Sequence, residues 1–456
     1  MKLSFKKVIP LDLFYILSLG LLVLISSLLG YGSFALMLST FIFWLSVIYI
    51  SFVKYKDLMS FRGLFLIGNI FVFFIPIIYM SFFKDWYWVS YKFSAVEINE
   101  IDLIKIIQVT TIGIIAFMLG YSLLNIKLDV ASNDELIENS KKWRRLLFVI
   151  LVSSFFLMVI RRIELFYFVL NNGFSAIYTQ GIESSFVESV LAYMFYVCAP
   201  ICFIIAKSYK EKNIIISMIV AEGVLHSLGG QRVWILFSIL QVLYLINHRL
   251  CSNEKIPIKS RLKLITKLFV IAIIMIYLMG YILHVREDVE FDIFNFSILD
   301  YFIGQFGTIV GLKLVLTNYD FAFSSNIPPI LDTININRQS VQAIVDGTVS
   351  NLGSRVTYLA CSTCFYDGRS YGNSIYMQLY QLGLWGVFFG AFVIGFFCRF
   401  LDLNKKDSMY IFIIGFFMCK HILWMPRGEY FPHYINIVLI TSTCFLAFFI
   451  QRKIRF

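Results

Sequence analysis

Long apolar runs alternate with short polar segments along the whole chain of 456 residues. Apolar runs of roughly 17–25 residues match the thickness of a bilayer core, so they indicate transmembrane helices. The alternating ten-residue pattern of a membrane β-barrel does not occur. We predict about twelve helical spans, at 11–29, 34–53, 64–83, 106–125, 146–160, 190–206, 214–228, 233–247, 268–285, 384–400, 409–426 and 435–451.

The composition agrees with a chain that lies mostly in lipid. Hydrophobic residues make up 59% and charged residues 15%, and the mean hydropathy is +0.80. Soluble domains carry about a quarter charged residues. The predicted fold class is therefore an all-α polytopic membrane protein.

The net charge of +11 reflects the expected topology and does not indicate a nucleic-acid partner. If the N-terminus is inside, 26 of the 39 lysines and arginines lie in the cytoplasmic connections and termini. Cytoplasmic segments of membrane proteins are enriched in these residues. With an even number of spans, both termini are then cytoplasmic.

One outer loop is far longer than the others and divides the chain. We expect nine helices in 1–285, a large outer loop or cap in 286–382, and three helices in 383–456. Within the loop, 299–316 is apolar enough for an interfacial helix. Cys361 and Cys364 form the motif CSTC there, which fits either a disulfide or two free thiols in a tight turn.

The stretch HSLGGQRVWILF, at 226–237, joins two spans of only about fifteen residues each. Its tip places Arg232 at or just below the outer interface. An arginine at that depth is usually tolerated only in a polar cavity or with a partner, although snorkelling to lipid headgroups is the alternative. Glu222 and His226 are four residues apart, so they share one helical face.

Further polar residues gather at the outer ends of other spans. The turn WMPRGEYFPHY places Arg427, Glu429 and His433 together, with Lys420 and His421 deeper in the span; a solvated turn is the alternative. The remaining candidates lie at a span end and in the large loop, and they are Arg161, Arg162, Arg286, Arg338, Arg355, Asp367, Arg369, Tyr371 and Asn373.

These arginines favour a phosphate-bearing ligand, because the planar guanidinium binds phosphate through two parallel hydrogen bonds. A lipid-linked diphosphate in the outer leaflet fits this pattern, and the abundant Trp and Tyr suit stacking on sugars. The chain has no metal-ligand spacing, P-loop or Gly-x-Ser-x-Gly motif. No metal or other cofactor is expected.

The layout of spans and the motifs GGQR, GRSYGNSIYMQLYQLGLWG and RGEYFP together resemble the Wzy-type O-antigen polymerases. This resemblance covers most of the chain and implies a GT-C-like membrane fold in the bacterial inner membrane. By motif position, it assigns essential roles to Arg232, Arg369 and Arg427. Arg161 and Arg162 match more loosely, as an arginine pair opening a loop that contains Tyr178.

The resemblance implies polymerisation of oligosaccharide repeat units linked to undecaprenyl diphosphate, on the periplasmic face. The expected partners are this substrate, membrane lipid and a chain-length-regulating protein. The arginines are then expected to stabilise the leaving diphosphate, and Glu429 or His433 is the candidate base. A flippase for the same lipid-linked units and an O-antigen ligase remain alternatives. The absence of two similar halves disfavours the flippase.

Overall fold

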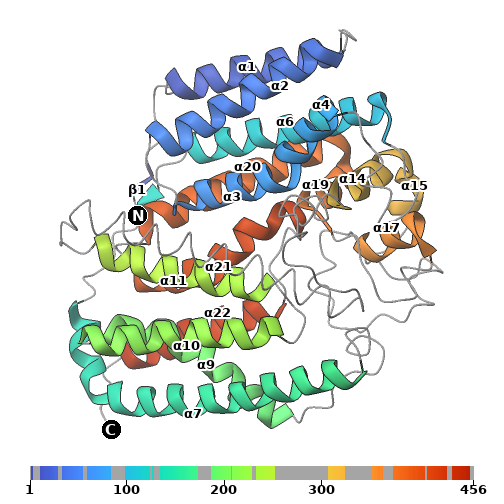
Figure 1. Ribbon diagram of the computed structural model, residues 1–456. Coiled ribbons are helices and arrows are strands. Elements are labelled where there is room, and N and C mark those ends of the chain that lie inside the picture. The colour runs from blue at the N-terminus through green and yellow to red at the C-terminus, as the bar shows by residue number, and fades with distance from the viewer. Residues whose placement is uncertain are drawn as a thin grey trace. The chain divides into compact units, whose positions relative to one another are not determined.

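A computed structural model describes the greater part of the chain (Figure 1). The described residues are 2–3, 11–28, 33–54, 59–83, 98–123, 126–127, 134–172, 186–206, 208–228, 233–251, 307–323, 352–362, 373–405, 408–428 and 434–451. Nearly all of them are helical, which confirms the predicted all-α class.

Eleven of the twelve predicted spans coincide with described helices, and the span predicted at 268–285 lies outside the described residues. Six helical segments of the described chain are long and apolar enough to cross a membrane, and five shorter helices are also apolar. The polytopic character inferred from hydropathy is therefore confirmed.

The chain folds into two compact units, and each is built from segments distant in sequence. The first unit contains Met1–Asp129, Phe302–Lys405 and His421–Tyr434. The second unit contains Val130–Tyr301, Lys406–Lys420 and Ile435–Phe456.

The first unit comprises most of the described elements. They are β1 (Lys2–Leu3), α1 (Leu11–Leu28), α2 (Ser33–Ile48), η1 (Tyr49–Lys54), α3 (Phe61–Asn69), η2 (Ile70–Phe74), α4 (Ile75–Phe83), α6 (Glu100–Leu123), β2 (Ile126–Lys127), α14 (Gly307–Thr317), α15 (Tyr319–Ala322), α17 (Leu352–Ala360), α19 (Ile375–Leu379), η4 (Tyr380–Leu382), α20 (Gly383–Asn404) and η5 (Met425–Arg427).

Helices α6 and α20 pack with their backbones in close contact. A Cβ atom added to Gly120 would lie 2.0 Å from the Phe392 carbonyl oxygen, and one added to Gly395 would lie 2.1 Å from the Phe117 carbonyl oxygen. Small residues allow this approach in membrane helices, where van der Waals packing drives association. The two glycines thus bring together segments that are more than two hundred residues apart.

The predicted span 64–83 is one apolar run whose helix changes pitch in the middle. Its central part, η2, is a π-helix and directly precedes Pro76 in α4. Proline lacks an amide hydrogen and clashes with the preceding helical turn, which a local change of pitch relieves. Just before η2, Asn69 accepts a 2.6 Å hydrogen bond from the buried Tyr376 hydroxyl of α19.

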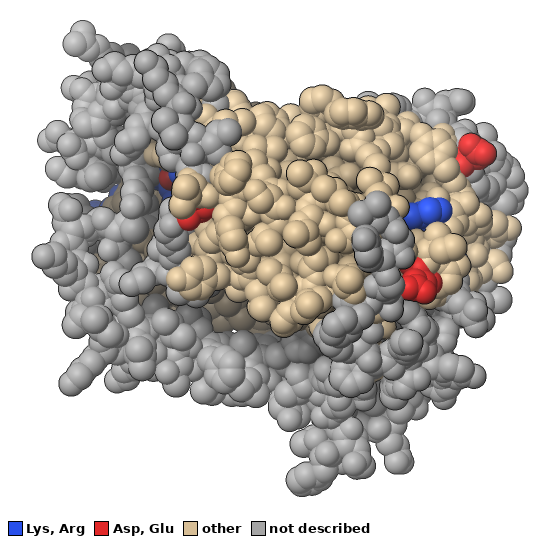
Figure 2. All heavy atoms as spheres, turned by 90° about the horizontal axis from the view of Figure 1, so that it is seen from above, with Lys and Arg blue, Asp and Glu red and all other residues tan. Residues whose placement is uncertain are grey.

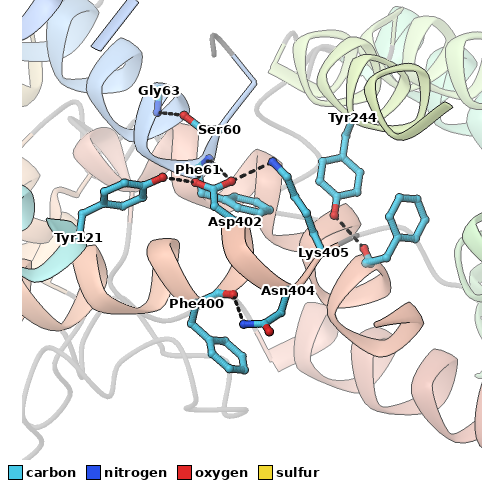
Figure 3. Close-up of polar contacts among 10 residues, drawn as sticks. Ser60, Phe61, Gly63, Tyr121, Tyr244, Phe400, Asp402, Asn404 and Lys405 are labelled. Carbon is cyan, nitrogen blue, oxygen red and sulfur yellow. Dashed lines mark hydrogen bonds and ion pairs between the residues drawn. The ribbon is translucent and has the colours of Figure 1, made fainter. Parts of the chain in front are cut away.

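Asp402 links three elements at one end of the first unit (Figure 3). Its carboxylate accepts hydrogen bonds from the Phe61 amide at 3.0 Å, from the Tyr121 hydroxyl at 2.9 Å and from the Lys405 ammonium at 2.8 Å. The ends of α3, α6 and α20 are therefore held together. By the predicted topology, this end faces the cytoplasm.

Part of the predicted large loop is packed as short helices of the first unit. In α14, most side chains are buried, and Lys313 lies 3.8 Å from Asp102 at the start of α6. Residues 299–306 of the predicted interfacial helix lie outside the described residues. Cys361 is disulfide-bonded, which excludes the free-thiol alternative for it, and Cys364 lies outside the described residues.

The second unit is a bundle of long helices. Its described elements are α7 (Asp134–Asn172), α9 (Phe186–Ile205), α10 (Tyr209–Leu228), α11 (Val233–Cys251), most of α21 (Met409–Trp424) and α22 (Tyr434–Gln451). Helix α10 packs against α7, α9 and α11 (Figure 1). The Tyr244 hydroxyl of α11 donates a 3.2 Å hydrogen bond to the Phe412 carbonyl of α21.

Helix α7 is longer than the predicted span 146–160, and it corrects the assignment of 161–189 as a loop. The helix continues to Asn172, and its apolar part covers Trp143–Val169. The sequence after Arg162 is still apolar at helical spacing, so it extends the helix in place of a loop. At the other end of this region, α9 begins at Phe186.

The outer surface of the helices is apolar, as expected for contact with lipid tails. Figure 2 shows a face on which the described residues are almost all uncharged. On α1, the side chains of Leu11, Phe14 and Leu28 are 85%, 65% and 78% exposed. Exposure of this kind along whole helices suits a hydrocarbon environment.

Candidate active site

Arg162 and Glu222 form a buried ion pair between α7 and α10 in the second unit. The Arg162 Nη2 and Nε atoms both donate to Glu222 Oε1, at 3.1 and 3.2 Å. The Glu222 side chain is only 1% exposed, and that of Arg162 is 17% exposed. The position predicted for Arg162, at the opening of a loop, is wrong because α7 continues for ten more residues. Its charge is neutralised by a carboxylate of the protein itself.

His226 contacts the same carboxylate oxygen. Its Nδ1 atom lies 3.2 Å from Glu222 Oε1, which confirms that the two residues share a helical face. Glu222 therefore orients the His226 ring while it neutralises Arg162.

Trp234, the second residue of α11, joins this cluster to α21. Its ring stacks on the His226 imidazole, with centroids 4.1 Å apart and planes 16° apart. The Lys420 ammonium lies 4.8 Å from the Trp234 ring centroid and 5.9 Å from that of Phe237. Lys420 is 6% exposed, so its charge is held inside the protein on aromatic faces.

Tyr196 of α9 adds a hydroxyl to the deeper part of the cluster. This side chain is 6% exposed, and no hydrogen bond of ordinary length joins its hydroxyl to a described residue. It interacts electrostatically with Glu222 and Arg162.

The α10–α11 hairpin positions these groups by close packing at its tip. A Cβ atom added to Gly223 would lie 2.2 Å from Ser238 Oγ, so glycine allows the two helices to approach. The Ser227 hydroxyl accepts a 3.0 Å hydrogen bond from the Ile235 amide in the first turn of α11. First-turn amides lack intrahelical partners, so a side-chain acceptor there stabilises the start of the helix. The hairpin is thus rigid on both sides of GGQR.

Three other predicted residues lie in the first unit. Arg355 of α17 is 1% exposed, and Asn373 is 8% exposed and directly precedes Ser374, the N-cap of α19. Arg427 of η5 lies over the Trp424 ring, with its Cζ atom 5.2 Å from the centroid. Helix α14 contacts both α17 and α19, and α19 contacts η5. The elements at these three residues are therefore linked in a chain of contacts through α14 and α19.

Arg161 lies on α7 beside Arg162 and is partly exposed. The remaining predicted site residues lie outside the described residues; they are Arg232, Arg369, Glu429, His433, Arg286, Asp367, Tyr371 and Tyr178. We predict that Arg232, Arg369 and Arg427 line one cavity, and this stays a prediction because Arg232 and Arg369 lie outside the described residues.

The structure adds Tyr196 and Trp234 to the candidate site, and it brings Lys420, which the sequence already marks as a polar residue within a span, to the same cluster. A lysine within an apolar span was a usable signal, because such residues are rare in membranes and face the protein interior. Trp234 and Tyr196 gave no comparable signal, since aromatic residues are abundant throughout this chain. Their role depends on which helix faces meet, and that information lies in the packing.

The fold and this cluster define a class of protein. It is a polytopic helical membrane protein that holds cations, a carboxylate and an imidazole inside a helix bundle, which is typical of a site for a charged substrate.

The comparison with known families is more specific. The family model for the O-antigen polysaccharide polymerase Wzy matches residues 13–455. The chain belongs to this family. No curated protein and no solved structure matches the chain. The GT-C-like arrangement therefore stays a prediction.

Proposed function

We propose that this protein is an inner-membrane glycosyltransferase that polymerises oligosaccharide repeat units carried on undecaprenyl diphosphate, on the periplasmic face. The observation that carries this proposal is the family match over residues 13–455, nearly the whole chain. The buried cluster around Glu222 supports it, because a transferase for a diphosphate-linked donor needs cations in a site shielded from water.

In the proposed reaction, the growing chain on undecaprenyl diphosphate is the donor. A hydroxyl at the non-reducing end of a new lipid-linked unit attacks the anomeric carbon of the donor. The bond from that carbon to the diphosphate oxygen breaks, and undecaprenyl diphosphate leaves with the electron pair. The hydroxyl proton passes to a base of the protein.

Arginines stabilise the charge that develops on the leaving diphosphate. Arg232, Arg369 and Arg427 are proposed for this role on the basis of their family motifs. Glu429 and His433 remain candidate bases, and His226 is a third, because its hydrogen bond to Glu222 orients the imidazole. Arg162 is proposed to act through this pair, since its charge is already neutralised.

A gene deletion tests the proposal. A strain that lacks the polymerase should carry single repeat units on its surface glycolipid, and the long-chain ladder should return when the gene is restored. Loss of a ligase leaves no repeat units on the glycolipid, and loss of a flippase stops their export. Either of these two patterns would contradict the proposal.

A reconstituted reaction tests the activity directly. Purified protein in lipid vesicles should convert lipid-linked repeat units into a ladder of longer lipid-linked chains without any other protein. The reaction releases one undecaprenyl diphosphate for each bond formed, and that stoichiometry is the measured quantity. If no chain longer than one unit appears, the proposed activity is wrong.

A further inference from the structure

We propose that Lys420 binds the diphosphate of the lipid-linked substrate, as a buried positive charge that the described protein leaves unneutralised. This inference rests on the proposed function and names a further substrate-binding residue for it. It depends on the environment of one side chain in α21 and on the charges around it.

The first step is the burial of Lys420. The side chain is 6% exposed, and its ammonium lies over the rings of Trp234 and Phe237. Within the described residues, this ammonium has no hydrogen bond and no carboxylate in ion-pair distance. Aromatic faces attract a cation but only partly replace the hydration that it loses.

The second step is the charge balance of the cluster. The Glu222 carboxylate already has Arg162 and His226 at hydrogen-bond distance. Among the described residues of the cluster, the Glu222 carboxylate therefore stands against two basic side chains, Arg162 and Lys420. A buried charge without a partner is strongly unfavourable, so a site that keeps one is expected to receive an opposite charge from a ligand.

A buried hydroxyl group, that of Tyr196, belongs to the same cluster. The Tyr196 hydroxyl is buried beside Glu222 and Arg162, and no hydrogen bond of ordinary length joins it to a described residue. It gives the cluster a donor in addition to the Lys420 cation. Phosphate oxygens accept from hydroxyl as well as ammonium groups, so a ligand of this class also suits the polar groups on the Glu222 side of the cluster.

The position along the helices suits a lipid-linked substrate. Lys420 is four residues from the end of α21, His226 is two residues from the end of α10, and Trp234 is the second residue of α11. At 1.5 Å per residue, Lys420 is about 6 Å from its helix end. By the predicted topology this is the outer end, where a diphosphate headgroup anchored by a polyprenyl chain would lie.

The test is a binding measurement on the purified full-length protein in phospholipid-free detergent, with undecaprenyl diphosphate as the probe. The midpoint of thermal unfolding is followed as the probe concentration rises, because a ligand of the folded state raises it. In Lys420→Met, which keeps the aliphatic stem, the apparent Kd should rise roughly ten- to hundred-fold, as expected for one lost charge-assisted hydrogen bond.

Two further variants separate charge from packing. Lys420→Arg keeps the charge and should keep the probe-induced shift. Lys212→Met is the matched control, because Lys212 also lies over an aromatic ring of the second unit, 5.4 Å from the Phe203 centroid. Its binding should equal that of the natural protein. If Lys420→Met does not fold, Lys420→Gln serves in the same comparison.

Three results would overturn the proposal. The first is a Kd for undecaprenyl diphosphate in Lys420→Met that equals that of the natural protein. The second is an equal loss of affinity in Lys420→Arg and Lys420→Met, which would show that the shape of the side chain matters and not its charge. The third is an equal rise of the unfolding midpoint with phosphatidylglycerol, which would show that the site binds an ordinary bilayer headgroup.

The proposed function fails separately from this inference. If the natural protein makes no polymer from lipid-linked units in vesicles, the proposed function is wrong. If it makes polymer and Lys420→Met binds the probe normally, only the role of Lys420 is wrong.

Discussion

At the scale of single residues, Glu222 has the largest expected effect on stability. Replacing it by glutamine removes the negative charge between Arg162 and His226, and breaking a buried ion pair in this way costs about 3–5 kcal/mol. The midpoint of thermal unfolding in detergent should fall clearly. Adding Arg162→Met to Glu222→Gln should recover part of the loss, because the uncompensated charge is then removed.

The matched control is the Arg144–Glu211 ion pair of the same unit, whose side chains are 25% and 28% exposed. Partly exposed pairs of this kind contribute about 1 kcal/mol or less. Glu211→Gln should therefore change the midpoint much less than Glu222→Gln. Equal changes in the unfolding midpoint would show that burial does not strengthen the contribution of the Glu222 ion pair to stability.

A second residue-scale prediction concerns Arg232. If its guanidinium holds the leaving diphosphate through two parallel hydrogen bonds, Arg232→Lys should fail although the charge is kept. The loss of one transition-state donor typically lowers turnover by ~10²–10³. Surface-polysaccharide ladders, at matched membrane expression, should then show essentially single repeat units. A snorkelling arginine predicts normal ladders from the lysine variant, and that outcome would remove Arg232 from the site.

Sequence reasoning found the residue types of the site better than their partners. The spacing of Glu222 and His226 predicted their shared face, because four residues make about one helical turn. The pairing of Glu222 with Arg162 spans 60 residues and depends on how α7 and α10 pack. No local pattern encodes that packing, so the sequence alone indicates an Arg162 side chain that is available to the substrate.

At the scale of elements, the contact between α6 and α20 gives a direct test. Gly395→Ala places a methyl group 2.1 Å from the Phe117 carbonyl oxygen, and backbone has little freedom to move away. Overpacking of this kind costs about 1–3 kcal/mol. The thermal midpoint of the purified protein should fall, and polymer length should fall with it.

Gly311→Ala is the matched control for this prediction. Its added methyl group would lie 3.2 Å from Met377 Cε, the end of a flexible side chain that can turn aside. The midpoint should stay close to that of the natural protein. Equal effects at both glycines would contradict the close backbone packing of α6 and α20.

Most elements followed from the sequence because hydrophobic run length is a strong signal in membranes. Eleven predicted spans lie on described helices, and the clearest error is the end of α7. There, Arg161 and Arg162 interrupt the apolar run and suggested the start of a loop. The helix continues because the sequence after Arg162 is again apolar at helical spacing, and the Arg162 charge within it is neutralised by Glu222. The assignment of each segment to one of the two compact units depends on contacts between residues distant in sequence, so no local sequence pattern predicts it.

At the scale of the whole molecule, the predicted topology is testable by labelling. A cysteine at Ser340, in the large loop, should react with a membrane-impermeant thiol reagent added from outside. The background is a protein with Cys251, Cys361 and Cys364 replaced by serine. A cysteine at Ser260, in a predicted cytoplasmic segment, should react only after the membrane is opened. The reverse pattern would invert the topology derived from the distribution of Lys and Arg.

The Asp402 contacts have a mechanical consequence for the first unit. Hydrogen bonds from Phe61 and Tyr121 join the ends of α3 and α6 to the Asp402 carboxylate, and Lys405 holds the same carboxylate at the end of α20. Helices that are joined at one end separate by rotating about that end, so their far ends move the most. By the predicted topology the joined ends lie toward the cytoplasm, so we expect any separation of these helices to be widest toward the outer side of the membrane.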